Sequence, residues 1–182
     1  IEAVTLRVPK AVVCGLPHSE SEVYFVKSST ILKGNSMKIV RIQTSDGKIS
    51  LASQKSDGSL EQLQGDLFNQ LKPTGQSVTA AKILAPLEPA AILCIGLNYR
   101  KHAEEGKQAI PPHPVLFMKT ATAVQNPGDP IVLPRKLRSD KVDYECELAV
   151  IIGKRCHNVS RADALSHVLG YTCANDVSAR DW

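Results

Sequence analysis

The chain has 182 residues and a formal net charge of +4, with hydrophobic and charged fractions that are ordinary for a folded domain. Lys and Arg form no stripe interleaved with aromatic residues, so nucleic acid is not an expected partner. No apolar run approaches the roughly 20 residues that span a bilayer, so no membrane partner is expected either. The five cysteines are odd in number and scattered, which indicates reduced thiols in an intracellular protein, cytoplasmic or mitochondrial.

The first residue is Ile1 rather than Met, and a strand-like run follows Met37. We therefore interpret residues 1–36 as an extension of uncertain origin. This segment lacks the alternation of polar and apolar residues that is typical of a strand. We do not expect it to contribute a strand to the sheet of the domain that follows.

Residues 37–85 are predicted to form a small N-terminal domain rich in strands. Alternating residues at 38–43 return at 49–52 through an Asp-Gly turn. Further on, leucine and phenylalanine residues recur at helical spacing and predict a short helix over residues 60–71. Nothing in this unit suggests chemistry, so we interpret it as a scaffold or a dimer-contacting domain.

An almost wholly apolar run at residues 90–96 predicts a strand buried on both faces, with a short buried helix as the alternative. A short helical turn is expected next at residues 100–106, closed by Gly106. On such a turn His102 and Glu105 are neighbours on one face. Glu105 could orient the imidazole and raise its basicity, as a general base requires, or the two could form an ordinary exposed ion pair. The proline-rich loop that follows is typical of a lid and equally of any surface loop.

Three further elements are expected beyond this loop. Residues 115–119 predict a strand that ends in Lys119, which is either solvated or catalytic. Residues 131–133 predict a short strand. A capping-box pattern opens a predicted helix over residues 160–170, with Gly170 as its C-terminal stop.

The strongest chemical pattern lies in residues 142–153, which lead into an apolar, β-branched strand. Alternation places Glu145 and Glu147 on one face, with Cα atoms about 6–7 Å apart. Carboxylates this close repel each other, so inside a fold they require a proton or a cation, whereas on a wetted face they require neither. Residues 171–176 predict another strand that carries Asp176 at its end. Three carboxylates on adjoining strands would suit a hard divalent cation (Mg²⁺, Mn²⁺ or Ca²⁺), whereas zinc is disfavoured because no histidine lies at ligand spacing.

Five short motifs occur in a fixed order between residues 95 and 181. They are Ile95-Gly96-Leu97-Asn98-Tyr99, His102-x-x-Glu105, Pro114-Val115-Leu116-Phe117-x-Lys119, Tyr144-Glu145-x-Glu147-Leu148 and Asn175-Asp176-x-x-Ala179-Arg180-Asp181. In order and spacing this set resembles the fumarylacetoacetate hydrolase family. The resemblance extends from about Met37 to Trp182 and is densest from Leu93 onward.

The resemblance implies a mainly β fold with short helices (α+β), in which the catalytic part is a twisted β-roll or barrel. Residues 86–182 would then be a partial catalytic domain, because in this family that domain continues past the position of Trp182. The barrel is therefore expected to be incomplete at the C-terminus, and residues 1–182 alone to be insoluble or poorly packed. Members of the family are usually homodimers, so a homodimer is expected for the full-length protein.

The resemblance also assigns roles to the candidate residues. It implies that the three carboxylates hold Mg²⁺ or Mn²⁺. It further implies that His102 and Glu105 form a catalytic dyad on a mobile lid, and that Lys119 faces the substrate.

The function implied is metal-dependent cleavage of a C–C bond in a small keto acid, such as an acylpyruvate or a fumarylacetoacetate-like compound, through a metal-stabilised enolate. An oxaloacetate-type decarboxylase or a keto-acid isomerase would use the same site. A non-catalytic metal-binding module and a non-functional truncated fragment are the alternatives outside enzymology. The sequence does not choose among the reactions, nor does it identify the keto acid.

Overall fold

We describe the protein from a computed structural model. It describes residues 37–182 and, as backbone only, two short strands, β1 (Ala11–Cys14) and β2 (Phe25–Val26). Strands dominate the described residues, which confirms the expectation of a mainly β fold with short helices. None of the helices in this part of the chain has the length and apolar character needed to cross a membrane.

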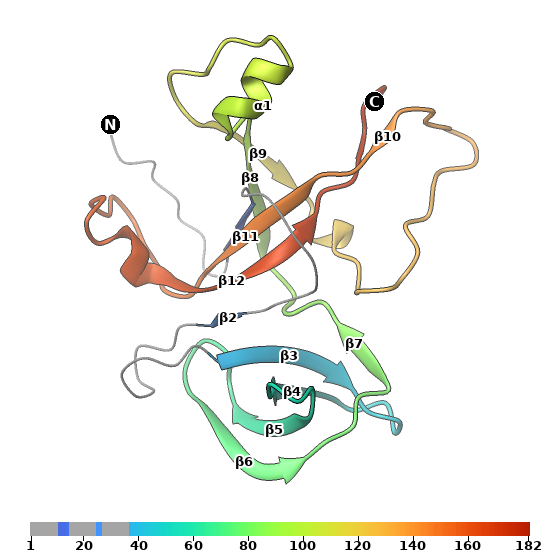
Figure 1. Cartoon of the computed structure of the whole chain (residues 1–182), viewed down its shortest axis with the longest axis vertical. Coiled ribbons are helices and arrows are strands. Elements are labelled where there is room, and N and C mark those ends of the chain that lie inside the picture. The colour runs from blue at the N-terminus through green and yellow to red at the C-terminus, as the bar shows by residue number, and fades with distance from the viewer. Residues whose placement is uncertain (1–10, 15–24, 27–36) are drawn as a thin grey trace.

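The N-terminal unit is an antiparallel arrangement of five strands, drawn in the lower half of Figure 1. They are β3 (Met37–Gln43), β4 (Ile49–Gln54), β5 (Leu60–Gly65), β6 (Leu71–Ser77) and β7 (Lys82–Leu84). One of its apolar clusters centres on Val40, Ile42 and Ala52, with the last two fully buried. The alternation read at residues 38–43 is therefore the pattern of a half-buried strand.

The helix predicted over residues 60–71 is wrong, because the chain forms the β5–β6 hairpin there. The side chain of Asp66 accepts hydrogen bonds from the backbone N–H of Phe68 (2.8 Å) and from the side chain of Asn69 (3.2 Å). Such a local bond stabilises a turn in competition with a helix. Leu63 and Leu71 are buried on the two strands, so the spacing of the leucines reflects a hairpin and not a helical face.

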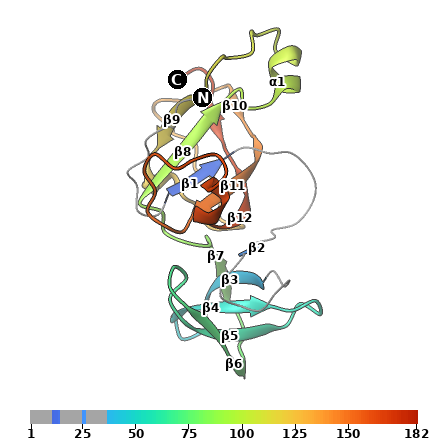
Figure 2. The same ribbon diagram turned by 90° about the vertical axis from the view of Figure 1, so that its left-hand side faces the viewer.

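The second unit contains the remaining strands and the only α-helix of the described residues. The elements are β8 (Ala91–Gly96), α1 (Arg100–Glu105), β9 (Val115–Lys119), the 3₁₀ turn η1 (Ala121–Ala123), β10 (Val142–Asp143), β11 (Cys146–Ile152), the 3₁₀ turn η2 (Ala164–His167), β12 (Val168–Asn175) and β13 (Ser178–Ala179). The strand at residues 90–96 and the helical turn closed by Gly106 are as expected. Figure 1 shows α1 above the end of β8, and Figure 2 confirms that it stands at the same end of the molecule.

Most strands join one sheet in the order β6-β5-β4-β3-β2-β12-β11-β1-β8-β9, and β10 and β13 form a separate pair. The backbone of β1 lies between β8 and β11, parallel to the first and antiparallel to the second. The short strand β2 bridges β12 and β3. The expectation that residues 1–36 add no strand is therefore wrong for these six residues; the remainder of that segment lies outside the described residues.

Two further predictions are corrected in this unit. Residues 131–133 form no strand, and the side chain of Val132 is 81% exposed. Residues 160–170 do not form one helix: the Ser160 side chain accepts a hydrogen bond from the Asp163 N–H (3.2 Å), yet the chain makes only the turn η2. Val168 to Gly170 are taken up by β12, which pairs with β11. The ladder of backbone hydrogen bonds outweighs the weak local preference for a helix.

Gly153 gives the structure a testable point of close packing. A Cβ atom at this position would lie 2.7 Å from the Cβ of Leu169 and 3.2 Å from its Cα. Gly153→Ala should therefore lower the free energy of unfolding by about 1–3 kcal/mol, as overpacking does. Gly106→Ala is the matched control, because its new Cβ meets nothing closer than 3.4 Å at a φ of −75°. Urea unfolding of both variants measures the difference, and equal stabilities would contradict the packing described.

Candidate metal centre

Two adjacent antiparallel strands bring the three predicted carboxylates together. Glu147 lies in β11 and Glu145 directly before it, whereas Asp176 directly follows β12. In the β11–β12 ladder Cys146 lies opposite Asn175. The N–H of Asp176 also donates to the carbonyl oxygen of Glu145 (2.8 Å), which extends the pairing by one step. The register therefore places the start of one strand against the end of the other.

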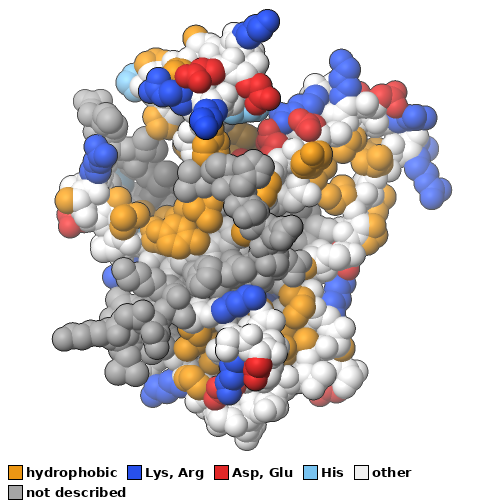
Figure 3. All heavy atoms as spheres, in the orientation of Figure 1, with side chains coloured by type: hydrophobic (Ala, Val, Ile, Leu, Met, Phe, Trp, Pro, Cys, Tyr) orange, Lys and Arg blue, Asp and Glu red, His pale blue; other side chains and the backbone are white. Residues whose placement is uncertain are grey.

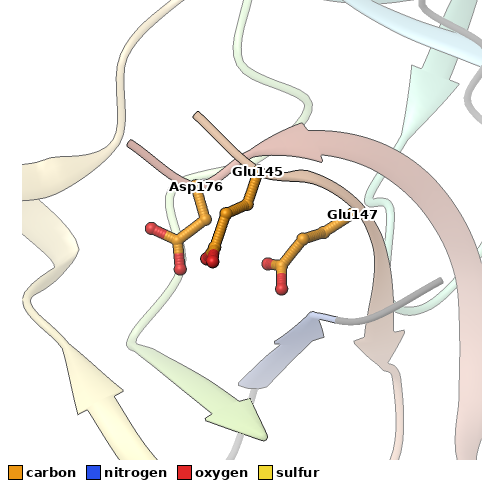
Figure 4. Close-up of side chains that lie close together, drawn as sticks. All are labelled: Glu145, Glu147 and Asp176. Atoms are coloured by element: carbon orange, nitrogen blue, oxygen red, sulfur yellow. The ribbon is translucent and has the colours of Figure 1, made fainter. Parts of the chain in front are cut away.

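The carboxylates converge as the alternation predicts. One oxygen from each of Glu145, Glu147 and Asp176 lies within 4.8 Å of the others. Figure 4 shows the three side chains side by side, pointing to the same side of the strand pair. Asp176 is only 9% exposed, and the two glutamates are half-buried. Like charges this close, partly removed from water, require compensation by positive charge.

Lys119 supplies part of this compensation. It stands at the end of β9, which pairs with β8, and its ammonium group forms an ion pair with Asp176. It also donates a hydrogen bond to the Ser178 hydroxyl (3.3 Å). The side chain is only 27% exposed. The sequence left Lys119 as either solvated or catalytic. In the structure its side chain lies at the carboxylate cluster and not in open solvent.

Arg180 adds a second positive charge beside the cluster, and sequence reasoning gave it no role. Its Nε donates to Asp143 (3.1 Å), and its guanidinium forms an ion pair with Glu145. These hydrogen bonds, to Glu145 first and Asp143 second, raise the pKa of Arg180 above its usual value. The available signal was its position four residues after Asp176, in the motif Asn175-Asp176-x-x-Ala179-Arg180-Asp181.

Two uncharged groups also border the cluster. Burial raises the pKa of the Cys94 thiol to about 11, and the charges of Asp176 and Glu147 add to the effect. Burial, followed by the charge of Glu147, raises the pKa of Tyr99 to about 12. The buried Tyr99 hydroxyl has no hydrogen-bond partner among the described residues. Both groups therefore stay protonated near neutral pH, and Tyr99 keeps a donor that a ligand could use.

The structure does not join the predicted dyad to the cluster. His102 and Glu105 are both exposed on α1. Within residues 37–182 no hydrogen bond or ion pair links these two side chains to each other or to Glu145 and Asp176. The chain enters α1 through Leu97, which has a φ of 48°, a conformation uncommon for a residue with a Cβ. The dyad and the lid remain predictions.

The donor set fits a hard divalent cation. It consists of carboxylate oxygens, which Mg²⁺, Mn²⁺ and Ca²⁺ prefer. Two ligands of one ion lie at most two bond lengths apart, about 5.2 Å for Ca²⁺ and about 4.2 Å for Mg²⁺. The separations of up to 4.8 Å admit the larger ion directly and the smaller one after a small contraction of the side chains.

Comparison with known proteins adds the family. The sequence model described as "Fumarylacetoacetate (FAA) hydrolase C-terminal" matches residues 91–182, half of the chain. The chain belongs to the fumarylacetoacetate hydrolase family. A second model, described as "Rv2993c-like, N-terminal", matches residues 37–91. The division proposed from the sequence, at residues 37–85 and 86–182, stays a prediction.

Curated relatives of this family member match it over part of their length. A "Fumarylacetoacetate hydrolase domain-containing protein 2 homolog" of Dictyostelium discoideum is 50% identical over 117 residues, which are 64% of this chain and 38% of that protein. "Oxaloacetate tautomerase fahd2, mitochondrial" of Xenopus laevis is 48% identical over 101 residues, 55% of this chain and 31% of that protein. The chain thus spans about two fifths or less of the curated relatives it matches.

Solved structures support the fold. The protein titled "Crystal structure of Cg1458 with inhibitor" superimposes with a TM-score of 0.69 at 39% identity, over 80% of this chain and 56% of that one. "Fumarylacetoacetate hydrolase (EaFAH) from psychrophilic Exiguobacterium antarcticum" superimposes with a TM-score of 0.61 at 30% identity, over 80% and 57%. The fold expected from the motifs, mainly β and of the fumarylacetoacetate hydrolase type, is therefore confirmed. The sheet is open, with β6 and β9 at its ends in the described residues.

Proposed function

We propose that the protein is an enzyme that acts on a small keto acid through an enolate, with a divalent cation held by Glu145, Glu147 and Asp176. The single observation that carries this proposal is the convergence of three carboxylates with Lys119 at their edge. A cluster with a purely structural role would need only enough positive charge to balance its carboxylates. Here Lys119, which is only 27% exposed, lies beside three carboxylates whose oxygens also suit a divalent cation.

Each residue of the site has a role in this chemistry. A bound cation would supply Lewis-acid polarisation of the carbonyl and carboxylate oxygens of the keto acid. Lys119 would stabilise negative charge that develops on a substrate oxygen next to Asp176. The protonated Tyr99 could donate its buried hydroxyl to the same ligand. His102, oriented by Glu105, would move the proton once the helix that carries them approaches the site.

The geometry supports enolate formation, and three reactions follow from it. Keto–enol tautomerisation of oxaloacetate needs only removal and return of a proton, and relatives that are 45–48% identical are named oxaloacetate tautomerases. Hydrolytic cleavage of a C–C bond in an acylpyruvate needs in addition a water activated by a base, for which the spacing of His102 and Glu105 is suited. We place tautomerisation first and hydrolysis second. Decarboxylation of oxaloacetate would use the same enolate.

Mg²⁺ is the ion that we propose, with Mn²⁺ and Ca²⁺ as alternatives. We also propose that the protein is a homodimer and that its location is cytoplasmic or mitochondrial. Size-exclusion chromatography with light scattering tests the homodimer. Neither the oligomeric state nor the location alters the chemistry assigned to the carboxylate cluster.

The proposal predicts cation-dependent turnover. Purified protein mixed with oxaloacetate and Mg²⁺ should speed the change in ultraviolet absorbance that accompanies enol–keto conversion. A parallel assay with an acylpyruvate reports hydrolysis. EDTA should reduce either rate to that of the protein-free control, and added Mg²⁺ should restore it. No acceleration of tautomerisation, hydrolysis or decarboxylation over Mg²⁺ alone would overturn the proposal.

A further inference from the structure

Asp181, near the C-terminus, is hydrogen-bonded to Ser139 and Asp140 in the segment before β10. One oxygen of this carboxylate accepts a hydrogen bond from the Ser139 hydroxyl, and the other accepts one from the Asp140 N–H (3.1 Å). Ser139 is only 6% exposed, and its oxygen also accepts the Lys141 N–H (3.3 Å). The bond from Ser139 lowers the pKa of Asp181, so the carboxylate is charged at neutral pH. Figure 3 shows basic side chains gathered at the upper right, over the loop that leads into β10.

Arg180 continues these contacts toward the metal centre. Its backbone N–H donates to the carbonyl oxygen of Lys141 (2.8 Å). Its guanidinium contacts Asp143 and Glu145, as described above. An unbroken set of polar contacts therefore runs from Ser139 to Glu145.

These polar contacts stabilise a part of the fold that has little strand pairing of its own. Glu145 and Asp176 both lie just outside the β11–β12 ladder. Beyond them, the strand pairing in the described residues is that of β10 with β13, which have two residues each. A two-stranded pair of this kind is at best marginally stable in water. Side-chain contacts must therefore hold the ends that carry the carboxylates.

We propose that Asp181, through Ser139 and Arg180, is a positioning residue that fixes Glu145 and Asp176 at the separation needed to bind a divalent cation. The inference rests on the proposed function, because it concerns the same cation. Partners of metal ligands typically alter affinity about 10–100-fold when they are removed. Asp181 touches neither the cation nor the substrate in this proposal.

The test measures Mn²⁺ binding by EPR titration of the purified full-length protein. Asp181→Ala and Ser139→Ala should each weaken Mn²⁺ binding about tenfold, and the double variant should be little weaker than Asp181→Ala. Asp140→Asn is the matched control. It removes a charge from the same loop, but its carboxylate pairs with the exposed Arg138 and only its N–H contacts Asp181. It should bind Mn²⁺ as the wild type does.

Hydrogen exchange gives a second readout without metal. The amide of Asp140 should lose protection in Asp181→Ala, because its acceptor is gone. The inference is overturned if the Asp140 amide exchanges faster in Asp181→Ala while the Mn²⁺ affinity and the EPR spectrum of bound Mn²⁺ are unchanged. The hydrogen bonds of Asp181 would then have only a structural role. If Asp181→Ala does not fold, Ser139→Ala decides alone: a tenfold loss supports the inference, and wild-type affinity overturns it. If wild-type protein binds no divalent cation, the proposed function fails and this inference fails with it.

Discussion

Glu147→Gln should weaken divalent-cation binding about a hundredfold while leaving the fold intact. Glutamine has nearly the same shape as glutamate, but it removes one full negative charge from a set of three carboxylates. The number of charged ligands is a main determinant of affinity for hard cations. Glu147 lies within β11, so its backbone pairing is unaffected by the change. Calorimetric titration with Mg²⁺ and Mn²⁺ measures the loss.

Glu104→Gln is the control for this experiment. Glu104 lies exposed on α1, and the substitution is chemically identical. It should bind cations as the wild type does. Equal losses in the two variants would mean that general surface charge, and not the cluster, attracts the ion. Unchanged affinity in Glu147→Gln would remove Glu147 from the ligand set.

His102→Ala should lower kcat about 10²–10⁴-fold, the usual contribution of a general base. Divalent-cation affinity should stay close to that of the wild type, because His102 is exposed on α1 and is not one of the three grouped carboxylates. The fall in kcat is expected for whichever reaction the assays with oxaloacetate and an acylpyruvate identify. Steady-state kinetics and an Mn²⁺ titration on the same preparation measure the two quantities.

His113→Ala is the matched histidine control, since His113 is exposed in the proline-rich loop that follows α1. Its kcat should equal that of the wild type. A parallel fall of rate and metal affinity in His102→Ala would make His102 a ligand or a structural residue. Wild-type kcat in that variant would exclude it as the base.

The convergence of the carboxylates could be predicted because it depends on local rules. Alternation along one strand sets Glu145 and Glu147 on the same side, and a following strand that pairs antiparallel brings Asp176 to the same end. For Lys119 the position at the end of an apolar strand left a solvated and a catalytic role open, and only the family resemblance implied that it faces the substrate. For the carboxylates the signal lies within a few residues of the chain.

The failures involve competition or long-range contacts. A short side-chain bond at Asp66 converts an apparently helical spacing into a hairpin. β1 obtains its place from pairing with β8, some 80 residues away, which its own four residues do not encode. Arg180 acquires its role only when β10 and β13 pair. Sequence patterns report the preferences of a segment, whereas these outcomes depend on which partner the segment meets.

The central claim is that three carboxylates hold one divalent cation. Anomalous diffraction from crystals of this protein grown with Mn²⁺ tests it most directly. The account predicts a single strong peak within about 2.0–2.6 Å of one oxygen each from Glu145, Glu147 and Asp176. A structure at saturating Mn²⁺ without a peak there, with Lys119 and Arg180 still paired to Asp176 and Glu145, would contradict it.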